Sequence, residues 1–313
     1  MPDEQHKHKH HHKKKKRWWK WVLIALGLFL LVDAVIVGKL YFDAKKAVDV
    51  TYKAVKHDDK RTGSVNLDNG QPFSVLLLGS DTGEYGRTEQ GRSDTIMVAA
   101  VTPNKTELLS IPRDTLVTIA GHPGNNKINA AYSYDGVSGA LNTLQSYLDI
   151  PIDHYIEINM KGLEQLSEAI GPVKVDNDLE FTNLDVHFPK GEVTINADNI
   201  LAYTRMRYED PRGDYGRQLR QRQVLTALVE KAASIDSLAK YHSILNAISA
   251  NMKTDLTFDD IKDIVTNYGG AKNIDQIQLK GNGQMIDGVS YEVVPKENLD
   301  KVQAQLKQTL NLK

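Results

Sequence analysis

The hydrophobic pattern divides the chain into one continuous apolar segment near its start and a long region of short, alternating segments. Residues 21–38, WVLIALGLFLLVDAVIVG, hold a single charged residue, Asp33. A helix rises about 1.5 Å per residue, so a segment of this length nearly spans a hydrocarbon core of roughly 30 Å. Lys39 and Tyr41 suit the membrane interface that follows it. We therefore predict one transmembrane helix over residues 21–39.

The charges around this segment predict its orientation. Residues 1–20 hold eight lysines and arginines against two acidic residues. Because basic residues mark the cytoplasmic side, we predict a basic cytoplasmic tail over residues 1–20 and a single-pass protein of the cell membrane whose remaining chain lies outside the cell. A cleaved signal peptide is the alternative, but no small-x-small cleavage pattern follows the apolar segment. The histidines in HKHKHHHKKKKR could bind a metal or resemble a cloning tag, whereas the interleaved lysines favour a basic tail that faces lipid.

Short apolar segments predict three neighbouring strands after a polar stalk and linker over residues 40–70. The strands cover residues 73–81, 93–101 and 106–114. If they pair as antiparallel neighbours, one edge of the sheet collects Asp81, Arg92, Asp94 and Arg113. The loop between the first two strands is long and rich in glycine, which is typical of functional loops.

Strands and helices continue to alternate along the rest of the chain, which predicts an α/β fold. We expect a helix at 138–148, a strand at 153–159, a helix at 160–169, a strand at 172–176, a short helix at 196–203, an extended stretch at 204–207 and a helix from residue 216. Helices at 236–249 and 257–268, strands at 276–280 and 289–294, and a final helix from Pro295 follow. No change in composition separates these segments, so we predict one extracellular domain over residues 71–313, within which the role of residues 234–313 stays open.

The composition excludes several classes of chemistry. Cysteine is absent, which removes disulfides, thiolate nucleophiles and cysteine-ligated metals. The first 20 residues carry a net charge of about +6, so the remainder carries about −7, and an acidic body argues against a general nucleic-acid binder. The phosphate-loop, G-x-S-x-G and H-E-x-x-H motifs are also missing.

Arginine is concentrated in one segment of this acidic body. Residues 203–223, YTRMRYEDPRGDYGRQLRQRQ, hold six arginines and three acidic residues. In an extended stretch, Arg205 and Arg207 would point to the same side and form a clamp. Guanidinium groups bind phosphoryl oxygens through paired hydrogen bonds, and paired carboxylates favour Mg²⁺, which also contacts phosphates. Together with Arg92, Arg113, Lys127, Arg217 and the acids Asp81, Asp94 and Asp214, the pattern predicts a pyrophosphate site; salt bridges among the same residues are the alternative.

Several of these motifs, in this order, resemble the LytR-CpsA-Psr family of cell-wall glycopolymer ligases, with the greatest similarity to its LytR branch. They are LLLGSD, GRSDT, SIPRDT, KINAAY and the arginine-rich segment, and they follow a single N-terminal anchor. The resemblance covers roughly residues 71–230, and the ordered set is far more specific than any one motif. It implies a central mixed β-sheet flanked by helices, an α-β-α arrangement, with a deep apolar tunnel for a lipid.

The resemblance also implies a function and a set of site residues. It implies a Mg²⁺-dependent phosphotransferase that moves a glycopolymer, such as teichoic acid or capsular polysaccharide, from a polyprenyl pyrophosphate carrier to peptidoglycan. The implied metal ligands are Asp81 and Asp94; the implied pyrophosphate-binding residues are Arg92, Arg113, Lys127, Arg205, Arg207, Arg217 and Gln221; the implied catalytic residues are Asp94, Arg113, Asp214, Arg205 and Arg207. Gly83 departs from the family pattern, in which many members have an arginine two positions after the first acid.

Three questions stay open at this point. Either Asp94 or Asp214 could orient or deprotonate the attacking sugar hydroxyl. A pyrophosphate hydrolase that uses water as acceptor would need the same residues, and a non-catalytic regulator that binds polyprenyl phosphate would share most of them. The RGD tripeptide at residues 212–214 could suggest an adhesion ligand, but the family motif accounts for it better.

Overall fold

The computed structural model describes residues 37–58, 60, 61, 63–81, 91–233 and 241–312. The chain forms two compact units, Met1–Lys45 and Lys46–Lys313. Residues 37–51 are helical. The predicted tail and nearly all of the predicted anchor lie outside the described residues, and none of the described helices is long and apolar enough to cross a membrane.

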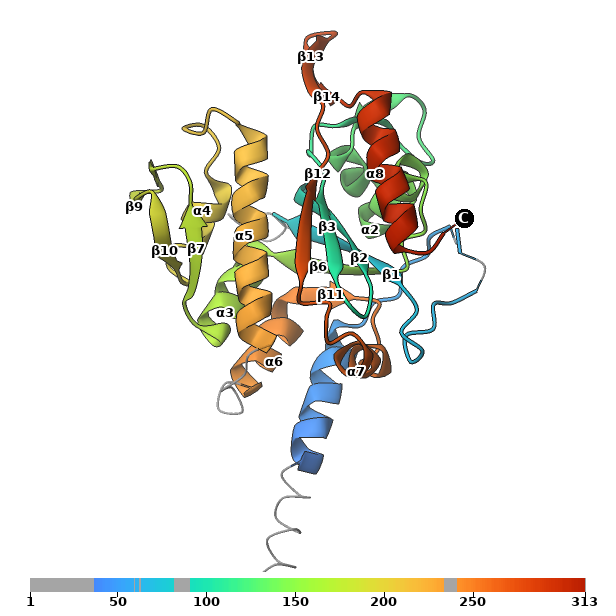
Figure 1. Cartoon of the computed structure of the whole chain (residues 1–313), viewed down its shortest axis with the longest axis vertical. Helices are drawn as coiled ribbons and strands as arrows, with labels where there is room; N and C mark the ends of the chain where they lie inside the picture. The colour runs from blue at the N-terminus through green and yellow to red at the C-terminus, as the bar shows by residue number, and fades with distance from the viewer. Residues whose placement is uncertain (1–36, 59, 62, 82–90, 234–240, 313) are drawn as a thin grey trace, which may run out of the picture. The chain divides into compact units, whose positions relative to one another are not determined.

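A six-stranded mixed sheet forms the centre of the larger unit, with the strand order β11-β6-β1-β2-β3-β12 (Figure 1). Its strands are β1 (Phe73–Ser80), β2 (Ser93–Val101), β3 (Thr106–Ser110), β6 (His154–Asn159), β11 (Met252–Thr254) and β12 (Ile274–Gln278). β1, β2 and β3 pair as antiparallel neighbours, which confirms the predicted pairing. β6 and β12 run parallel to β1 and β3.

Helices cover both faces of this sheet, as the α-β-α prediction requires. On one face, Leu76, Leu78 and Val98 join a buried apolar cluster that also contains residues of α2 (Asn129–Leu148) and α8 (Lys296–Thr309). On the other face, Phe73, Val75 and neighbouring residues pack with α5 (Asp214–Ala233) and α7 (Phe258–Asn267). Figure 1 shows α5 and the pair α2 and α8 on opposite sides of the sheet. Strands buried on both faces read as nearly continuous apolar runs, which is the pattern of FSVLLLGS and SDTIMVAAV.

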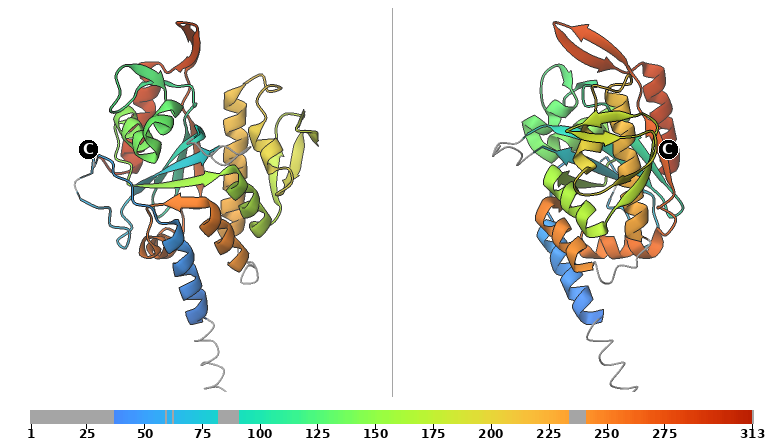
Figure 2. Two further views of the ribbon diagram at one scale, coloured as in Figure 1. Left: turned by 180° about the vertical axis from the view of Figure 1, so that it is seen from behind. Right: turned by 90° about the vertical axis from the view of Figure 1, so that its left-hand side faces the viewer.

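A second layer packs against the outer side of α5 (Figure 2). It contains α3 (Met160–Ile170), β7 (Val173–Asn177), β8 (Phe181–Asn183), β9 (Val186–Phe188), β10 (Gly191–Ile195) and α4 (Ile200–Arg205). These elements bury a separate apolar cluster around Tyr203 and Ile200. α5 therefore lies between two cores, which explains why it carries few exposed side chains along its length.

The remaining elements lie at the ends of the sheet. They are β4 (Leu116–Thr118), β5 (Asn125–Lys127), α6 (Tyr241–Asn251), β13 (Asn282–Ile286) and β14 (Val289–Val293). β13 and β14 form a hairpin that extends beyond the body of the domain (Figures 1 and 2).

Two local predictions were wrong. α2 begins at Asn129, ahead of the predicted residue 138, and continues across a kink at Asp135 and Gly136; the glycine and the polar residues there hid the first turns. The predicted extended stretch at 204–207 was wrong for its first half, because α4 continues to Arg205 and only Met206 turns extended. Thr204, whose hydroxyl donates to the carbonyl of Ile200, is held inside that helix.

The segment between the first helix and β1 lies against the larger unit. Arg61 pairs with Asp153 at 2.6 Å, and the side-chain amide of Gln145 donates to the carbonyl oxygen of Asp58 at 2.7 Å. Leu67 is buried in the cluster on the α5 face of the sheet. Part of the segment predicted as a polar linker thus contributes to the packing of the domain.

Candidate active site

The ends of β1 and β2 place the two acids predicted to hold a metal at the same edge of the sheet. Ser80 pairs with Ser93 after a register shift, so Asp81 follows one strand where Asp94 begins the other. An oxygen of the Asp81 carboxylate accepts the backbone N–H of Arg92 at 3.0 Å. A Cβ atom at Gly91 would lie 1.9 Å from that oxygen. Glycine is therefore required where the chain returns past the carboxylate.

The third strand brings Arg113 to this edge. Its Nη1 lies 2.7 Å from Oδ2 of Asp94, and its Nε lies 3.8 Å from Oδ2 of Asp114. Lys127, at the end of β5, reaches the other oxygen of Asp114 at 2.8 Å. Asp114 thus links two of the predicted phosphate-binding cations, although it was not among the predicted site residues. Its position directly after Arg113 in SIPRDT was the signal available in the sequence.

The first turn of α5 completes the cluster from more than a hundred residues away. Nη2 of Arg217 lies 2.5 Å from Oδ1 of Asp214 and donates to the backbone carbonyl of Asp94 at 3.2 Å. The side-chain amide of Gln218 donates to Oδ2 of Asp214 at 2.7 Å. We refer to Asp94, Arg113, Asp214 and Arg217 as the arginine–aspartate site.

Burial and mutual charge shape the electrostatics of the arginine–aspartate site. Only 6% of Arg217 is exposed, and burial lowers its pKa, with a further lowering from the charges of Arg113 and Arg207. Burial also acts to lower the pKa of Arg113, but Asp94, with Asp114 and Asp214, outweighs it, so the net pKa of Arg113 is raised. Guanidinium groups whose charges act on one another, as those of Arg113 and Arg207 act on Arg217, favour an anionic ligand.

Buried polar atoms at this site lack hydrogen-bond partners within the protein. They include Nε of Arg113, Nε of Arg217 and Oε1 of Gln221. The amide nitrogen of Gln221 reaches the carbonyl oxygen of Thr204 at 3.5 Å. Because buried polar groups are nearly always paired in folded proteins, these atoms fit a polar ligand that would supply the missing partners.

The other predicted cations occupy different positions around the cluster. Arg207 is half-buried and lies close enough to influence the pKa of Arg217. Arg92 is exposed beside Asp81, and Arg205 is exposed at the last residue of α4. Arg205 is therefore in the helix and Arg207 beyond it, so the extended geometry from which the clamp was predicted is not present.

Two other arginines of the dense segment, Arg212 and Arg220, form salt bridges that stabilise the fold. Asp210 accepts hydrogen bonds from Nε and Nη2 of Arg212, each at 2.9 Å, and from Nη1 of Arg220 at 2.8 Å. Arg220 also donates to the carbonyl oxygen of Met206, and Arg212 reaches Asp178. We call Asp210, Arg212 and Arg220 the Asp210 cluster. With Arg212 held in this way, the RGD tripeptide has a structural explanation.

The Asp210 cluster depends on a buried negative charge. Burial raises the pKa of Asp210, but the hydrogen bonds from Arg212 and Arg220 outweigh burial and lower it to about 2. A Cβ atom at Gly216 would lie 1.8 Å from Oδ2 of Asp210. Glycine at this position lets the carboxylate approach the first turn of α5.

Asp81 and Asp94 are suitable for a hard cation. Within the described part of the chain, no group of three or more histidine, cysteine, aspartate or glutamate side chains is arranged to hold a metal ion. Mg²⁺ commonly takes one or two carboxylates and completes its shell with waters and substrate phosphates. Two carboxylates at one sheet edge, beside guanidinium groups, fit that mode of binding.

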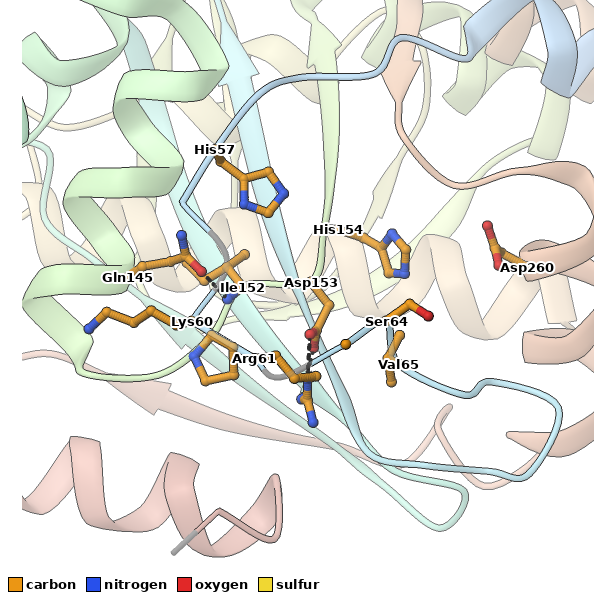
Figure 3. A pocket seen from close by; sticks show the side chains of 12 residues that line it. His57, Lys60, Arg61, Ser64, Val65, Gln145, Ile152, Asp153, His154 and Asp260 are labelled. Carbon is orange, nitrogen blue, oxygen red and sulfur yellow. Dashed lines mark hydrogen bonds and ion pairs between the residues drawn. The ribbon is translucent and has the colours of Figure 1, made fainter.

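A cavity of about 430 Å³ lies at the opposite end of β1 and β6 (Figure 3). His57, Arg61, Asp153 and His154 are among its lining residues. Asp153 already accepts hydrogen bonds from Arg61 and from both the N–H and the hydroxyl of Ser74. The principal ion pair of this cavity is thus satisfied within the protein, while both ring nitrogens of His154 are buried without a hydrogen-bond partner among the described residues.

Comparison with known proteins shows one family. The LytR_cpsA_psr family matches residues 38–308. A protein of Enterococcus faecalis named polyisoprenyl-teichoic acid–peptidoglycan teichoic acid transferase TagU is 48% identical over 296 residues, which cover 93% of this chain and 97% of that protein. A crystal structure from E. faecalis described as a transcriptional regulator superposes with a TM-score of 0.72 at 43% identity, covering 80% of this chain and 92% of that one. B. subtilis TagU superposes with a TM-score of 0.62 at 37% identity, covering 78% of this chain and 98% of that one.

Proposed function

This chain belongs to the LytR_cpsA_psr family, and from that premise we propose that it transfers a teichoic-acid-type glycopolymer from a polyprenyl pyrophosphate carrier to peptidoglycan. The name of the E. faecalis relative specifies a polyisoprenyl-linked teichoic acid as donor and peptidoglycan as acceptor. The observation that carries the proposal is the convergence of Arg113 and Arg217 on Asp94 and Asp214, with buried guanidinium N–H groups left without partners.

The chemistry of the transfer matches this arrangement. A hydroxyl of a wall sugar attacks the phosphorus that carries the glycopolymer, the pyrophosphate P–O bond breaks, and polyprenyl phosphate leaves. Negative charge spreads over the phosphoryl oxygens in the transition state. Arg113 and Arg217 are positioned to bind those oxygens, with Lys127 and Arg207 adding positive charge nearby. No covalent enzyme intermediate is required.

Mg²⁺ is the cofactor that we propose for the site. Asp81 and Asp94 would hold it through carboxylate oxygens. When bound, the ion would neutralise charge on the pyrophosphate and favour departure of the leaving group.

An acid at the site receives the proton of the sugar hydroxyl. Asp94 and Asp214 are both candidates, because each carboxylate is paired with a guanidinium that would turn to the phosphate once the substrate binds. The predicted transmembrane helix over residues 21–39 would keep this chemistry at the outer leaflet, where a polyprenyl-linked donor resides.

A product analysis tests the proposal. The full chain in detergent or liposomes is incubated with a polyprenyl-linked teichoic acid, Mg²⁺ and peptidoglycan, and the wall fraction is examined for covalently attached polymer. We expect attachment that requires both the donor and Mg²⁺ and that EDTA abolishes. Release of free polymer alone would favour the hydrolase, and tight lipid binding without turnover would favour a regulator. Undiminished transfer in EDTA would contradict the proposed cofactor.

A further inference from the structure

The C-terminal part of the chain holds the first turn of α5, where Asp214 lies. We infer that Gln278 and Gln218 form a relay of two side-chain amides that positions Asp214 for the transfer reaction. The inference rests on the proposed function, because Asp214 is one of its two candidate acids. It gives a role to Gln278 of β12, within residues 234–313, whose role the sequence left open.

The relay starts at the edge strand β12 and ends at the carboxylate. Nε2 of Gln278 donates to Oε1 of Gln218 at 3.3 Å, and Nε2 of Gln218 donates to Oδ2 of Asp214 at 2.7 Å. The other carboxylate oxygen faces Arg217. Asp214 is thus held from two sides, with the guanidinium of the site on one and the relay on the other.

The direction of each hydrogen bond in the relay is fixed by the acid. An ionised carboxylate only accepts hydrogen bonds, so Gln218 must turn its NH₂ group towards Asp214. Its carbonyl oxygen then faces Gln278, which must offer a donor in turn. Gln278 therefore supports the orientation of the Gln218 amide that the carboxylate of Asp214 requires.

A second contact from the same part of the chain holds the same turn. The hydroxyl of Tyr215 donates to Oε1 of Glu292 at 2.5 Å and accepts the N–H of Gly281 at 2.8 Å. The N–H of Glu292 donates to the carbonyl oxygen of Asp114 at 2.9 Å, so β14 contacts both sides of the arginine–aspartate site. Burial and the carboxylate of Glu292 raise the pKa of Tyr215, which keeps its hydroxyl protonated as a donor.

Substitution of the two amides tests the relay in the full chain. We expect Gln218→Met to lower kcat of glycopolymer transfer about tenfold to a hundredfold, because displacement of a catalytic group lowers the rate by about that factor. The KM for the lipid-linked donor should stay nearly unchanged. Gln278→Met should have a smaller effect of the same kind. Gln276→Met is the matched control: Gln276 lies on the same strand two residues earlier and accepts a hydrogen bond from Arg222. The control should lower the thermal midpoint without lowering kcat.

A double-mutant cycle shows whether Gln218 acts through Asp214. Gln218→Met should lower kcat by a larger factor in the unmodified chain than in an Asp214→Asn background, because the carboxylate that Gln218 positions is absent from the Asp214→Asn variant. The thermal midpoints of the Gln218 and Gln278 single and double variants should likewise be non-additive. This second measurement needs no activity.

The outcomes separate this inference from the proposed function. If the unmodified chain transfers polymer and Gln218→Met keeps its kcat, the relay is wrong and the function stands. If the unmodified chain transfers nothing, the proposed function fails, and additive thermal midpoints would then overturn the relay as well. Equal losses of kcat in the Gln276 and Gln278 variants would reduce the relay to a general packing effect.

Discussion

The arginine–aspartate site and the Asp210 cluster each include an arginine of α5 and use the same two residue types, but they serve different ends. In the Asp210 cluster the carboxylate is saturated by Arg212 and Arg220, and the side chain of Arg220 is 1% exposed. Among the residues that the structure describes, both clusters contain buried N–H groups without partners, at Nε of Arg113 and Arg217 in one and at Nε of Arg220 in the other. In the arginine–aspartate site, however, the side chains of Asp94, Arg113 and Asp214 are 29%, 22% and 17% exposed. The Asp210 carboxylate is therefore closed off from a ligand, whereas the arginine–aspartate site is accessible to one.

The comparison shows that residue type and spacing do not separate binding arginines from structural ones. Arg217 and Arg220 stand three residues apart on α5 and both are buried. The acid that each meets makes the difference. Asp210 is locked beside Gly216 in the loop before the helix, whereas Asp214 is shared between Arg217 and an amide from the same helix.

Removal of Arg220 should give the largest effect on stability. Arg220→Met leaves a buried carboxylate with one cation fewer, and loss of one partner from a buried pair costs about 3–5 kcal/mol in the free energy of unfolding. Chemical unfolding of the full chain measures the loss. Transfer activity per folded molecule should be unchanged, and a variant of wild-type stability would contradict the structural role of the cluster.

Removal of Arg217 should lower activity more than it lowers stability. Arg217→Met deletes one donor to the transferring phosphoryl group, and loss of such a donor lowers kcat about 10²–10³-fold. The thermal midpoint should fall less than in Arg220→Met, because Asp214 keeps the hydrogen bond from Gln218 and 17% of its side chain is exposed, whereas the side chain of Asp210 is fully buried. Steady-state transfer kinetics test the expected loss of kcat, and a thermal unfolding curve of the same variant tests the expected effect on stability. A cooperative loss of structure in this variant would erase the distinction between the two clusters.

Acid should weaken the Asp210 cluster over a defined range. The pKa of Asp210 is about 2, below its ordinary value of 3.8. At pH values between about 2 and 3.8, Asp210 is therefore protonated in the unfolded chain but ionised in the folded chain. The stabilisation that the Asp210 carboxylate gives the folded chain is complete above about pH 4 and is lost as the pH falls towards 2. The difference in unfolding free energy between the unmodified chain and Asp210→Asn should shrink across this range. A constant difference would show that the carboxylate is not the titrating group.

Arg222 sharpens the comparison with the smallest expected effect. It is buried, its Nε donates to Gln276 at 3.1 Å, and burial lowers its pKa to about 10. A buried cation without a carboxylate partner contributes little to stability, so Arg222→Met should be neutral or stabilising by about 1 kcal/mol. Thermal unfolding at neutral pH decides this. A loss as large as that of Arg220→Met would mean that Arg222 has a charged partner.

Much of the fold could be predicted from local pattern, and the errors have local causes. The three apolar runs before residue 114 gave β1, β2 and β3 with their antiparallel pairing, because buried strands bounded by glycine and turn residues carry a strong signal. The short strands β4, β8 and β9 were missed, since three residues hold too little periodicity to detect. The assignment of Asp81 and Asp94 to one sheet edge followed from strand pairing alone.

Some site residues could be identified from the sequence and others only from the structure. Arg113, Lys127 and Arg217 were identified from motifs, and the structure joins them through Asp94, Asp114 and Asp214. Gln218, Gln278 and Tyr215 were not identified, because their contacts depend on where β12 and β14 meet α5. The spacing of residues along the chain does not predict the contacts of β12 and β14 with α5.

The sequence by itself determined the classes of element, the antiparallel order of the first strands, the family, and the presence of an excess of guanidinium groups. Those properties depend on periodicity and on the identity of nearby residues, which a linear pattern records. Only the tertiary structure decided which arginines surround a fully buried carboxylate and which lie in a partly exposed cluster that a ligand can reach. That distinction is set by burial and by contacts between segments separated by a hundred residues, where the free energy of a charge depends on its three-dimensional surroundings.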